Sequence, residues 1–275
     1  MEDCKYRIMI ETSSICNARC EFCSNPTLIR EKKVMDDETF NLILRRLEEE
    51  KIKVEKFILH LNGEPFTDKK LIERIRILKE KYADVPVWFT TNFSLPNEEK
   101  IEELLTSGLD TITISLNAAE QERYHKITGL NFERTTKNIE YLVRRNKELG
   151  NPIHIRMSIV DCGEESGVEE FKKKYSEMAE IRIIKLGKWI GKETGKINHK
   201  RQNIHRYCDD LHHQICILSN GDFAICCFDC EGQVNQNIKN VPIMQAFYSN
   251  PYLELREKIK KSILGTICEE CSFSY

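Results

Sequence analysis

The chain has 275 residues and a formal net charge of −2, from 42 basic and 44 acidic side chains that are interspersed along its length. This balance gives no excess of basic residues for binding nucleic acid, and no apolar run approaches the ~20 residues of a membrane-spanning helix. Hydrophobic residues make up 40% of the chain, and residues 1–5 do not resemble a signal peptide, so we expect a folded cytoplasmic protein.

The first 190 residues alternate short apolar segments with stretches of helical periodicity. The short segments are rich in Ile, Val and aromatic residues, which is typical of buried strands. Gly108 and Gly150 are well placed to end two of the intervening helices. Strands that alternate with helices predict an α/β fold with a parallel sheet, either open or curled into a partial barrel. The strand candidates are residues 6–11, 54–61, 85–90, 111–116, 153–160 and 181–186.

The pattern changes after residue 190. Asn220-Gly221 separates two apolar runs, 214–219 and 222–227, and this dipeptide is the strongest short-range signal for a β-hairpin. A helical tail follows, with Leu255 and Ile259 on its apolar face. We therefore expect two domains, residues 1–190 and a small cysteine-rich hairpin and helix extension over residues 191–275.

Twelve cysteines are a high count for a reducing compartment, where clustered thiols more often bind metal than form disulfides. Cys16, Cys20 and Cys23 directly follow the first predicted strand, and catalytic sites of parallel α/β proteins lie in the loops at such strand ends. A zinc site would need a fourth ligand, for which His60 is a candidate, whereas an iron–sulfur cluster would keep one metal position open for substrate. The spacing alone leaves both alternatives open.

The run Cys16-x3-Cys20-x2-Cys23, with Phe22 before the third cysteine, resembles the signature of the radical S-adenosylmethionine (SAM) superfamily. Asn62-Gly63-Glu64-Pro65, at the end of the second predicted strand, resembles the family's Gly-Gly-Glu-Pro motif, with Asn62 in place of the first glycine. That motif holds the amino group of the methionine part of SAM, so the resemblance assigns this role to Glu64 and its neighbours.

Further family motifs fall at the next strand ends. Thr90-Thr91-Asn92 resembles a Thr-Asn-Gly segment, with Phe93 in place of the glycine. Ser115-Leu116-Asn117-Ala118 resembles Ser-Leu-Asp-Ala, with Asn117 in place of the acid, and Ile127-Thr128-Gly129 falls where the family often has a similar tripeptide. The order of these motifs at successive strand ends is what makes the resemblance specific.

The resemblance implies a partial (β/α)6 barrel that holds a four-iron, four-sulfur (4Fe–4S) cluster on the three cysteines and SAM at the open iron. One electron, from a flavodoxin- or ferredoxin-type donor, cleaves SAM, and the resulting 5'-deoxyadenosyl radical removes a hydrogen atom from substrate. Thr91 and Ser115 are candidates to bond the ribose, or else satisfy strand ends, and Arg156 and Ser158 share one strand face. The expected cofactor contacts are Phe22, Asn62, Gly63, Glu64, Pro65, Thr91, Asn92, Ser115, Asn117, Arg156 and Ser158.

The second cysteine group resembles the SPASM and twitch extensions of radical SAM enzymes, which hold auxiliary iron–sulfur clusters. Its pattern is Cys208-x12-Gly221-x4-Cys226, followed by Cys268-x2-Cys271. We predict one auxiliary 4Fe–4S cluster on these four cysteines, with a zinc ribbon as the alternative. Strand alternation puts Cys227 on the apolar face with Phe223 and Ile225, which favours Cys226 as the ligand. Cys216 and Cys230 are the alternate ligands.

An auxiliary cluster near the substrate is a natural electron acceptor, so we expect oxidation of a small polyol or aminosugar. Epimerisation is an alternative, with Cys162 or Cys230 donating the hydrogen atom, and Lys185 or Lys188 are candidate bases. Maturation of a peptide is another; the first strand starts near Tyr6, so a leader would need a separate recognition protein. The non-enzymatic alternative is a two-site zinc-binding module.

Overall fold

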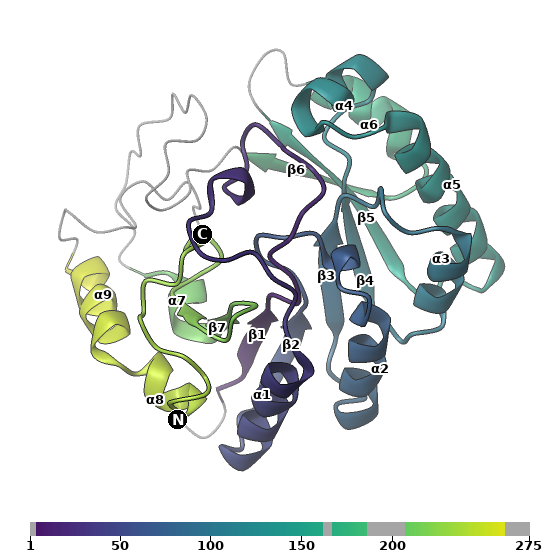
Figure 1. Cartoon of the computed structure of the whole chain (residues 1–275). Helices are drawn as coiled ribbons and strands as arrows, with labels where there is room; N and C mark the ends of the chain where they lie inside the picture. The colour runs from purple at the N-terminus through teal and green to yellow at the C-terminus, as the bar shows by residue number, and fades with distance from the viewer. Residues whose placement is uncertain (1–3, 162–166, 186–206, 262–275) are drawn as a thin grey trace.

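The computed structural model describes residues 4–161, 167–185 and 207–261. Its centre is an eight-stranded sheet with the strand order β6-β5-β4-β3-β2-β1-β7-β8 (Figure 1). All neighbours pair in parallel except β7 and β8, which pair antiparallel. Because β6 and β8 are the two edges of the described sheet, it forms a partial barrel and not a closed one.

All six predicted strands are confirmed, with ends that differ from the prediction by no more than three residues. The two further strands come from the predicted hairpin, in which Gly221 has a φ of +88° and its N–H donates to the carbonyl oxygen of Leu218. The docking of β7 beside β1 was not predicted, because hairpin signals are local and this pairing is not. The strands are β1 Tyr6–Ile10, β2 Val54–Ile58, β3 Val87–Thr91, β4 Thr111–Ser115, β5 His154–Asp161, β6 Glu180–Lys185, β7 Gln214–Ile217 and β8 Phe223–Ala224.

The helices begin where short polar side chains cap them. Asp36, Asn97 and Asn131 each accept a hydrogen bond from the backbone N–H three residues on, which satisfies a donor that the helix itself leaves free. The α-helices are α1 Asp37–Glu49, α2 Leu71–Lys81, α3 Glu98–Leu105, α4 Gln121–Thr128, α5 Phe132–Glu148, α6 Val168–Tyr175, α7 Asp209–His213, α8 Ile243–Phe247 and α9 Asn250–Lys260. Two 3-10 turns, η1 Asn25–Thr27 and η2 Pro65–Thr67, lie in the loops that follow β1 and β2.

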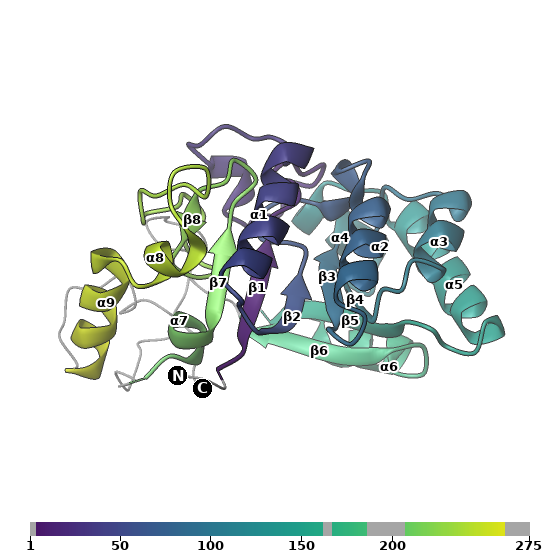
Figure 2. The ribbon, with the colours of Figure 1, turned by 90° about the horizontal axis from the view of Figure 1, so that it is seen from below.

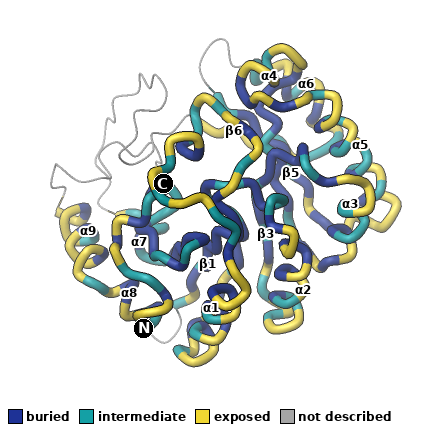
Figure 3. The backbone as a smooth tube through the Cα atoms, in the orientation of Figure 1, coloured by how far each residue is buried: buried dark blue, intermediate teal, exposed yellow. Residues whose placement is uncertain are grey.

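Helices α1 to α6 lie along one side of the sheet, which places the main core between them and the strands (Figures 1 and 2). Alternate strand residues such as Ile8, Phe57 and Ile112 point into this core and are fully buried. Figure 3 shows the central strands, such as β1, β3 and β5, largely buried and the outward faces of these helices exposed. The opposite, concave side of the sheet carries a smaller apolar cluster that includes Met9 and Cys216.

No helix in the described ranges is both long and apolar enough to cross a membrane. The predicted domain boundary near residue 190 lies outside the described residues.

Candidate radical SAM site

The three clustered cysteines lie in the loop after β1, at the end of the barrel where a catalytic site is expected. Their side chains are partly buried, and burial raises the pKa of Cys16 and of Cys20 to about 12. Neighbouring thiols contribute to the raised pKa of Cys20, since both Cys23 and Cys16 disfavour a negative charge there. Free thiols therefore stay protonated at neutral pH, and a metal centre would have to displace their protons.

Backbone N–H groups point at two of these sulfur atoms. The N–H of Ala18 donates to Cys16 Sγ and that of Asn25 donates to Cys23 Sγ, both at 3.4 Å. Hydrogen-bond donors of this kind stabilise a thiolate and tune an iron–sulfur cluster. Among the described residues, no group of three or more His, Cys, Asp or Glu side chains is arranged to bind a single metal ion. A 4Fe–4S cluster does not require that arrangement, because each cysteine ligates a separate iron.

Backbone hydrogen bonds join the cysteine loop to the C-terminal end of α4, a helix that was not predicted from the sequence. The N–H of Arg19 donates to the carbonyl oxygen of Thr128, and that of Glu21 donates to that of Ile127. Gly129 ends α4 with a φ of +74°. The Ile127-Thr128-Gly129 tripeptide thus supports the backbone between the cysteines, and Phe22 lies partly buried in the same segment.

Glu64 is a buried carboxylate, 2% exposed, at the loop after β2. It accepts hydrogen bonds from the Thr91 hydroxyl at 2.5 Å, the Asn92 N–H at 2.7 Å and the Phe66 N–H at 3.2 Å. Burial raises the pKa of Glu64 to about 7, and no basic side chain of the described residues offsets that burial. A buried carboxylate with three donors and no cation is suited to a cationic ligand such as an ammonium group.

Gly63 brings this loop against the segment that enters the cysteine loop. A Cβ at Gly63 would lie 2.0 Å from the carbonyl oxygen of Ser13, so no other residue fits without moving the backbone. The N–H of Glu64 donates to the carbonyl oxygen of Ile15, one residue before Cys16. Pro65 follows as the buried first residue of η2. The predicted Gly-Glu-Pro segment and the predicted cluster loop are therefore in direct contact.

Asn92 connects the end of β3 to the cysteine loop. Its side-chain amide donates to Asn17 Oδ1 at 2.9 Å and lies 4.0 Å from Cys16 Sγ. Asn17 in turn donates to the Ser94 hydroxyl at 2.8 Å. Asn17 was missed in the sequence, because a polar residue between two cysteines carries no signal of its own.

The predicted residues of β4 and β5 fall into two groups. The hydroxyls of Ser115 and Ser158 are 3.2 Å apart on the concave face, and Ser158 is fully buried. Asn117, two residues after β4, has a φ of +61°, and its Oδ1 accepts from the N–H of Val160 at 3.1 Å. Arg156 bonds to Glu180 at 3.1 Å, and Arg182 bonds to the same carboxylate.

His60 does not fit a zinc-ligand role. The N–H of Thr90 donates to His60 Nδ1 at 3.0 Å, so Nδ1 uses its lone pair and the proton of the neutral ring is on Nε2. Neither nitrogen is then free to bind a metal. Burial also lowers the pKa of His60 to about 4, which keeps the ring neutral.

The second cysteine group is only partly described. Cys208 lies at the N-terminal end of α7 without a capping side-chain hydrogen bond, Cys216 lies in β7 and Cys230 is fully buried. The strand-face argument for Cys226 over Cys227 fails, because β8 ends at Ala224 and both cysteines lie in the turn beyond it. The predicted residues that lie outside the described ranges are Cys162, Lys188, Cys268 and Cys271.

Cys226 and Cys227 nevertheless differ chemically. A hydrogen bond with the Cys227 thiol lowers the pKa of Cys226, and the N–H of Phe228 also donates to Cys226 Sγ at 3.4 Å. Cys226 is therefore the more acidic thiol of the pair. Lys185, a predicted base, is exposed at the end of β6.

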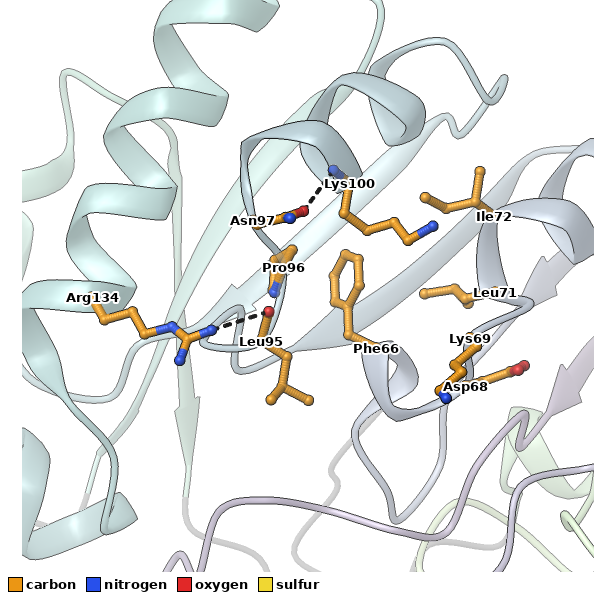
Figure 4. A pocket seen from close by; sticks show the side chains of 10 residues that line it. All are labelled: Phe66, Asp68, Lys69, Leu71, Ile72, Leu95, Pro96, Asn97, Lys100 and Arg134. Carbon is orange, nitrogen blue, oxygen red and sulfur yellow. Dashed lines mark hydrogen bonds between the residues drawn. The ribbon is translucent and has the colours of Figure 1, made fainter.

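A separate pocket of about 500 Å³ lies on the helix side of the sheet (Figure 4). Phe66, at its centre, packs against Phe89 and Phe93 of the main core. Arg134 donates to the carbonyl oxygen of Leu95, and Lys100 pairs with Glu103. None of the three cysteines lines this pocket, so it is distinct from the cluster site.

Sequence comparison decides the family. The profile of the Radical SAM superfamily matches residues 10–160, which include all three cysteines and Glu64. The chain belongs to the radical SAM superfamily. Curated relatives include a probable GTP 3',8-cyclase of Pyrococcus abyssi, 27% identical over 159 residues, which are 56% of this chain and 47% of that protein. One from Saccharolobus islandicus is 26% identical over 215 residues, 72% of this chain and 64% of that protein.

The chain spans about half the length of the first curated relatives it matches. Among solved structures, BtrN in complex with AdoMet and 2-DOIA has a TM-score of 0.68 at 17% identity, with 99% of this chain and 95% of that one covered. Streptococcus suis SuiB bound to S-adenosylmethionine has a TM-score of 0.71 at 17% identity, covering 97% of this chain and 72% of that one. At such identities these structures show a shared fold, the radical SAM partial barrel.

Membership implies a 4Fe–4S cluster and SAM, and the residues fit both. Cys16, Cys20 and Cys23 would hold the cluster, and Glu64 would hold the ammonium group of SAM. When bound, these groups supply reductive cleavage of SAM to a carbon radical that takes a hydrogen atom from substrate. The chain's own part is to order the cysteine loop through Asn92 and α4, and to keep a buried carboxylate ready for a cation.

Proposed function

We propose that this radical SAM enzyme oxidises a small polyol or aminosugar and that an auxiliary 4Fe–4S cluster accepts the second electron. The proposed ligands are Cys208, Cys226, Cys268 and Cys271, in a SPASM- or twitch-like module over residues 191–275 that follows a barrel over residues 1–190. A flavodoxin- or ferredoxin-type protein would supply the first electron.

One observation supports the proposal: two thiols of the C-terminal segment, Cys216 and Cys227, lie with the apolar cluster on the concave face of the sheet. Cys216 is buried in the same small cluster as Met9 and Ile58, and Cys227 packs against that cluster. β7 brings them there by pairing with β1, the strand that leads into the catalytic cysteines. A redox centre bound beside these thiols would lie on the same, concave face of the sheet as the proposed substrate.

The proposed reaction balances as follows. The 5'-deoxyadenosyl radical takes the hydrogen atom from a carbon that bears a hydroxyl group. The substrate radical then loses one electron to the auxiliary cluster and the hydroxyl proton to a base, for which Lys185 and Lys188 are candidates, and a C=O bond forms. The product is lighter than the substrate by two hydrogen atoms.

The names of the curated relatives favour a second candidate, ring closure on GTP. A nucleoside triphosphate needs several unpaired cations. On β5 and β6, Arg156 and Arg182 already bond to Glu180, and the hydrogen bond with His154 together with these arginines lowers the pKa of that carboxylate to about 2. The described concave face therefore suits a polyol better than a triphosphate.

The test is turnover of the reconstituted enzyme in heavy water with an aminocyclitol, an aminosugar and GTP in parallel. We expect one of the first two to raise 5'-deoxyadenosine formation above the substrate-free rate and to give a product without solvent deuterium that lacks two hydrogen atoms. A product that gains one deuterium at carbon would replace oxidation by epimerisation. Stimulation by GTP alone, with a ring-closed product, would overturn the proposal, as would stimulation only by a peptide with its recognition protein.

A further inference from the structure

Asn62 stands where the family motif has its first glycine; its side chain makes one hydrogen bond and its backbone makes two. Its Oδ1 accepts from the Ser24 hydroxyl at 3.0 Å, and its carbonyl oxygen accepts from the side-chain amide of Asn25 at 2.7 Å. Its own N–H donates to Glu11 Oε1 at 3.1 Å. Asn62 therefore joins the loop that bears Glu64 to the residues that directly follow Cys23.

These bonds connect Asn62 to the segment that positions Cys23, the third cysteine. Ser24 and Asn25 are both buried, and the N–H of Asn25 donates to Cys23 Sγ at 3.4 Å. A shift of Asn62 would therefore be passed through Asn25 to the Cys23 sulfur.

The Nδ2 group of Asn62 has no hydrogen-bond partner among the described residues, although the side chain is only 4% exposed. Buried donors without a partner are rare in folded proteins unless a ligand or an ordered water satisfies them. The backbone does not require asparagine here, because Asn62 is not among the residues with positive φ. Glycine would remove the unsatisfied donor at no conformational strain, so the donor itself calls for an explanation.

We propose that Asn62 Nδ2 donates a hydrogen bond to an anionic acceptor of the bound cluster and cofactor. Two groups with that chemistry would be held by the cysteine loop and the Glu64 loop: a sulfur atom of the 4Fe–4S cluster and the carboxylate of SAM. A donor to sulfur makes reduction of a cluster easier, because it stabilises the added negative charge. A donor to the carboxylate strengthens binding of SAM. Asn62 is then a positioning and tuning residue that glycine could not supply.

Three variants separate the proposed donor role of Asn62 Nδ2 from the structural role of the hydrogen bond between Asn62 and Ser24. Asn62→Gly removes the Ser24 bond and the donor, Asn62→Asp keeps the acceptor for Ser24 and removes the donor, and Ser24→Ala removes the bond alone. Each reconstituted holoprotein is measured for iron content, for the midpoint potential of the catalytic cluster without SAM, and for the affinity of SAM and of decarboxylated SAM under non-turnover conditions. None of these readouts depends on knowing the substrate.

If the acceptor is a cluster sulfur, Asn62→Gly shifts the midpoint potential to a more negative value than Ser24→Ala does. A tenfold change in the reduction equilibrium corresponds to ~59 mV for this one-electron couple. If the acceptor is the carboxylate, the potential without SAM is unchanged and SAM binds roughly tenfold more weakly to Asn62→Gly. Decarboxylated SAM then binds equally well to this variant and to the wild type.

The proposal is overturned if Asn62→Gly at full iron content matches Ser24→Ala in both potential and SAM affinity. That result would mean that the Asn62 side chain acts only through its hydrogen bond with Ser24. Should Asn62→Asp fail to take up iron, the comparison of Asn62→Gly with Ser24→Ala still decides, because glycine is the residue that the family motif has at this place.

Discussion

The loops after β1, β2 and β3 and the segment that follows β7 bring their polar groups to the barrel in different ways. In the first region, Cys16, Glu64 and Asn92 each follow a parallel strand, so the sheet itself places them at one edge. In the second, Cys208 lies at the N-terminal end of a helix and Cys226 lies in a turn. Strand order brings the residues of the first site to one edge, where contacts with α4 and Asn17 order them, whereas the second depends on how a hairpin docks on β1.

One buried carboxylate joins the two regions. Glu11, at the end of β1, pairs with Arg30 of the cysteine loop at 2.6 Å and accepts from the N–H of Ser219 at 2.9 Å. Arg30 also donates to the carbonyl oxygen of Cys230 at 2.6 Å, and Glu231 accepts from the N–H of Arg30. The catalytic loop and the C-terminal segment therefore share one polar network, although their sites form differently.

The comparison is tested most severely by removing cysteines from one region at a time. Replacing Cys16, Cys20 and Cys23 by alanine should abolish SAM cleavage and reduce the iron content from about eight to about four atoms per chain. Replacing Cys208 and Cys226 should also halve the iron but leave SAM cleavage in place and stop formation of the oxidised product. Iron analysis and 5'-deoxyadenosine assays measure both. Loss of all iron in either variant would show that the two regions do not form separate centres.

The shared network predicts the largest effect on stability. Arg30→Met leaves the fully buried Glu11 carboxylate without its cation, and breaking a buried ion pair in this way costs about 3–5 kcal/mol. The free energy of unfolding of the iron-free protein, from urea denaturation, measures it. Lys81→Met is the matched control, because it breaks the exposed Lys81–Glu48 pair and should change little. Equal effects of the two substitutions would contradict a shared buried network.

A smaller effect is expected at Glu64. Glu64→Gln keeps the shape but removes the charge that would meet an ammonium group, so SAM affinity should fall by about 1.5–3 kcal/mol. Titration of the holoprotein with SAM measures this loss, and Glu103→Gln, at an exposed ion pair, is the control. Unchanged affinity would remove Glu64 from the site.

The raised pKa of Glu64 has a pH consequence. The folded protein holds this proton up to about pH 7, whereas the unfolded chain loses it near the ordinary value of 4.5. Between these values the native state binds more protons, so the Glu64 contribution to stability falls as pH rises. A bound cation should reverse this by favouring the ionised form, and SAM binding near pH 7 should release about half a proton per site. Calorimetry in buffers of different ionisation enthalpy measures the release, which should vanish in Glu64→Gln.

The contrast between the regions also explains which features the sequence could predict. The six strands and the Glu64 loop were predicted because strand periodicity and the Gly-Glu-Pro segment are local patterns. Helix α4 was missed because it has few apolar residues, among them Tyr124 and Ile127. The positions of Cys226 and Cys227 were misjudged because the alternation of a strand was extended beyond Ala224, where the strand ends. The docking of β7 on β1 and the Asn17 contacts are tertiary, and no local pattern encodes them.

The smallest effect on stability is expected in the turn that carries Cys226. This turn lies beyond the end of β8 and is held by hydrogen bonds to the side chain of Asp229. Its carboxylate is fully buried and accepts from the N–H groups of Ile225, Gly232 and Gln233. Asp229→Asn removes acceptors, but it also removes a buried charge, since burial raises the pKa of Asp229. The two changes partly offset each other, so the loss of stability should be only about 1 kcal/mol.

The thiols of this turn should respond more strongly to Asp229→Asn. A looser turn weakens the hydrogen bonds that lower the pKa of Cys226 and exposes its sulfur atom. Alkylation of the iron-free protein, followed by peptide mass spectrometry, should show faster labelling of Cys226 and unchanged labelling of Cys16. Faster labelling of both cysteines would instead mean general loosening, and labelling unchanged at Cys226 would mean that the turn holds its thiol without Asp229.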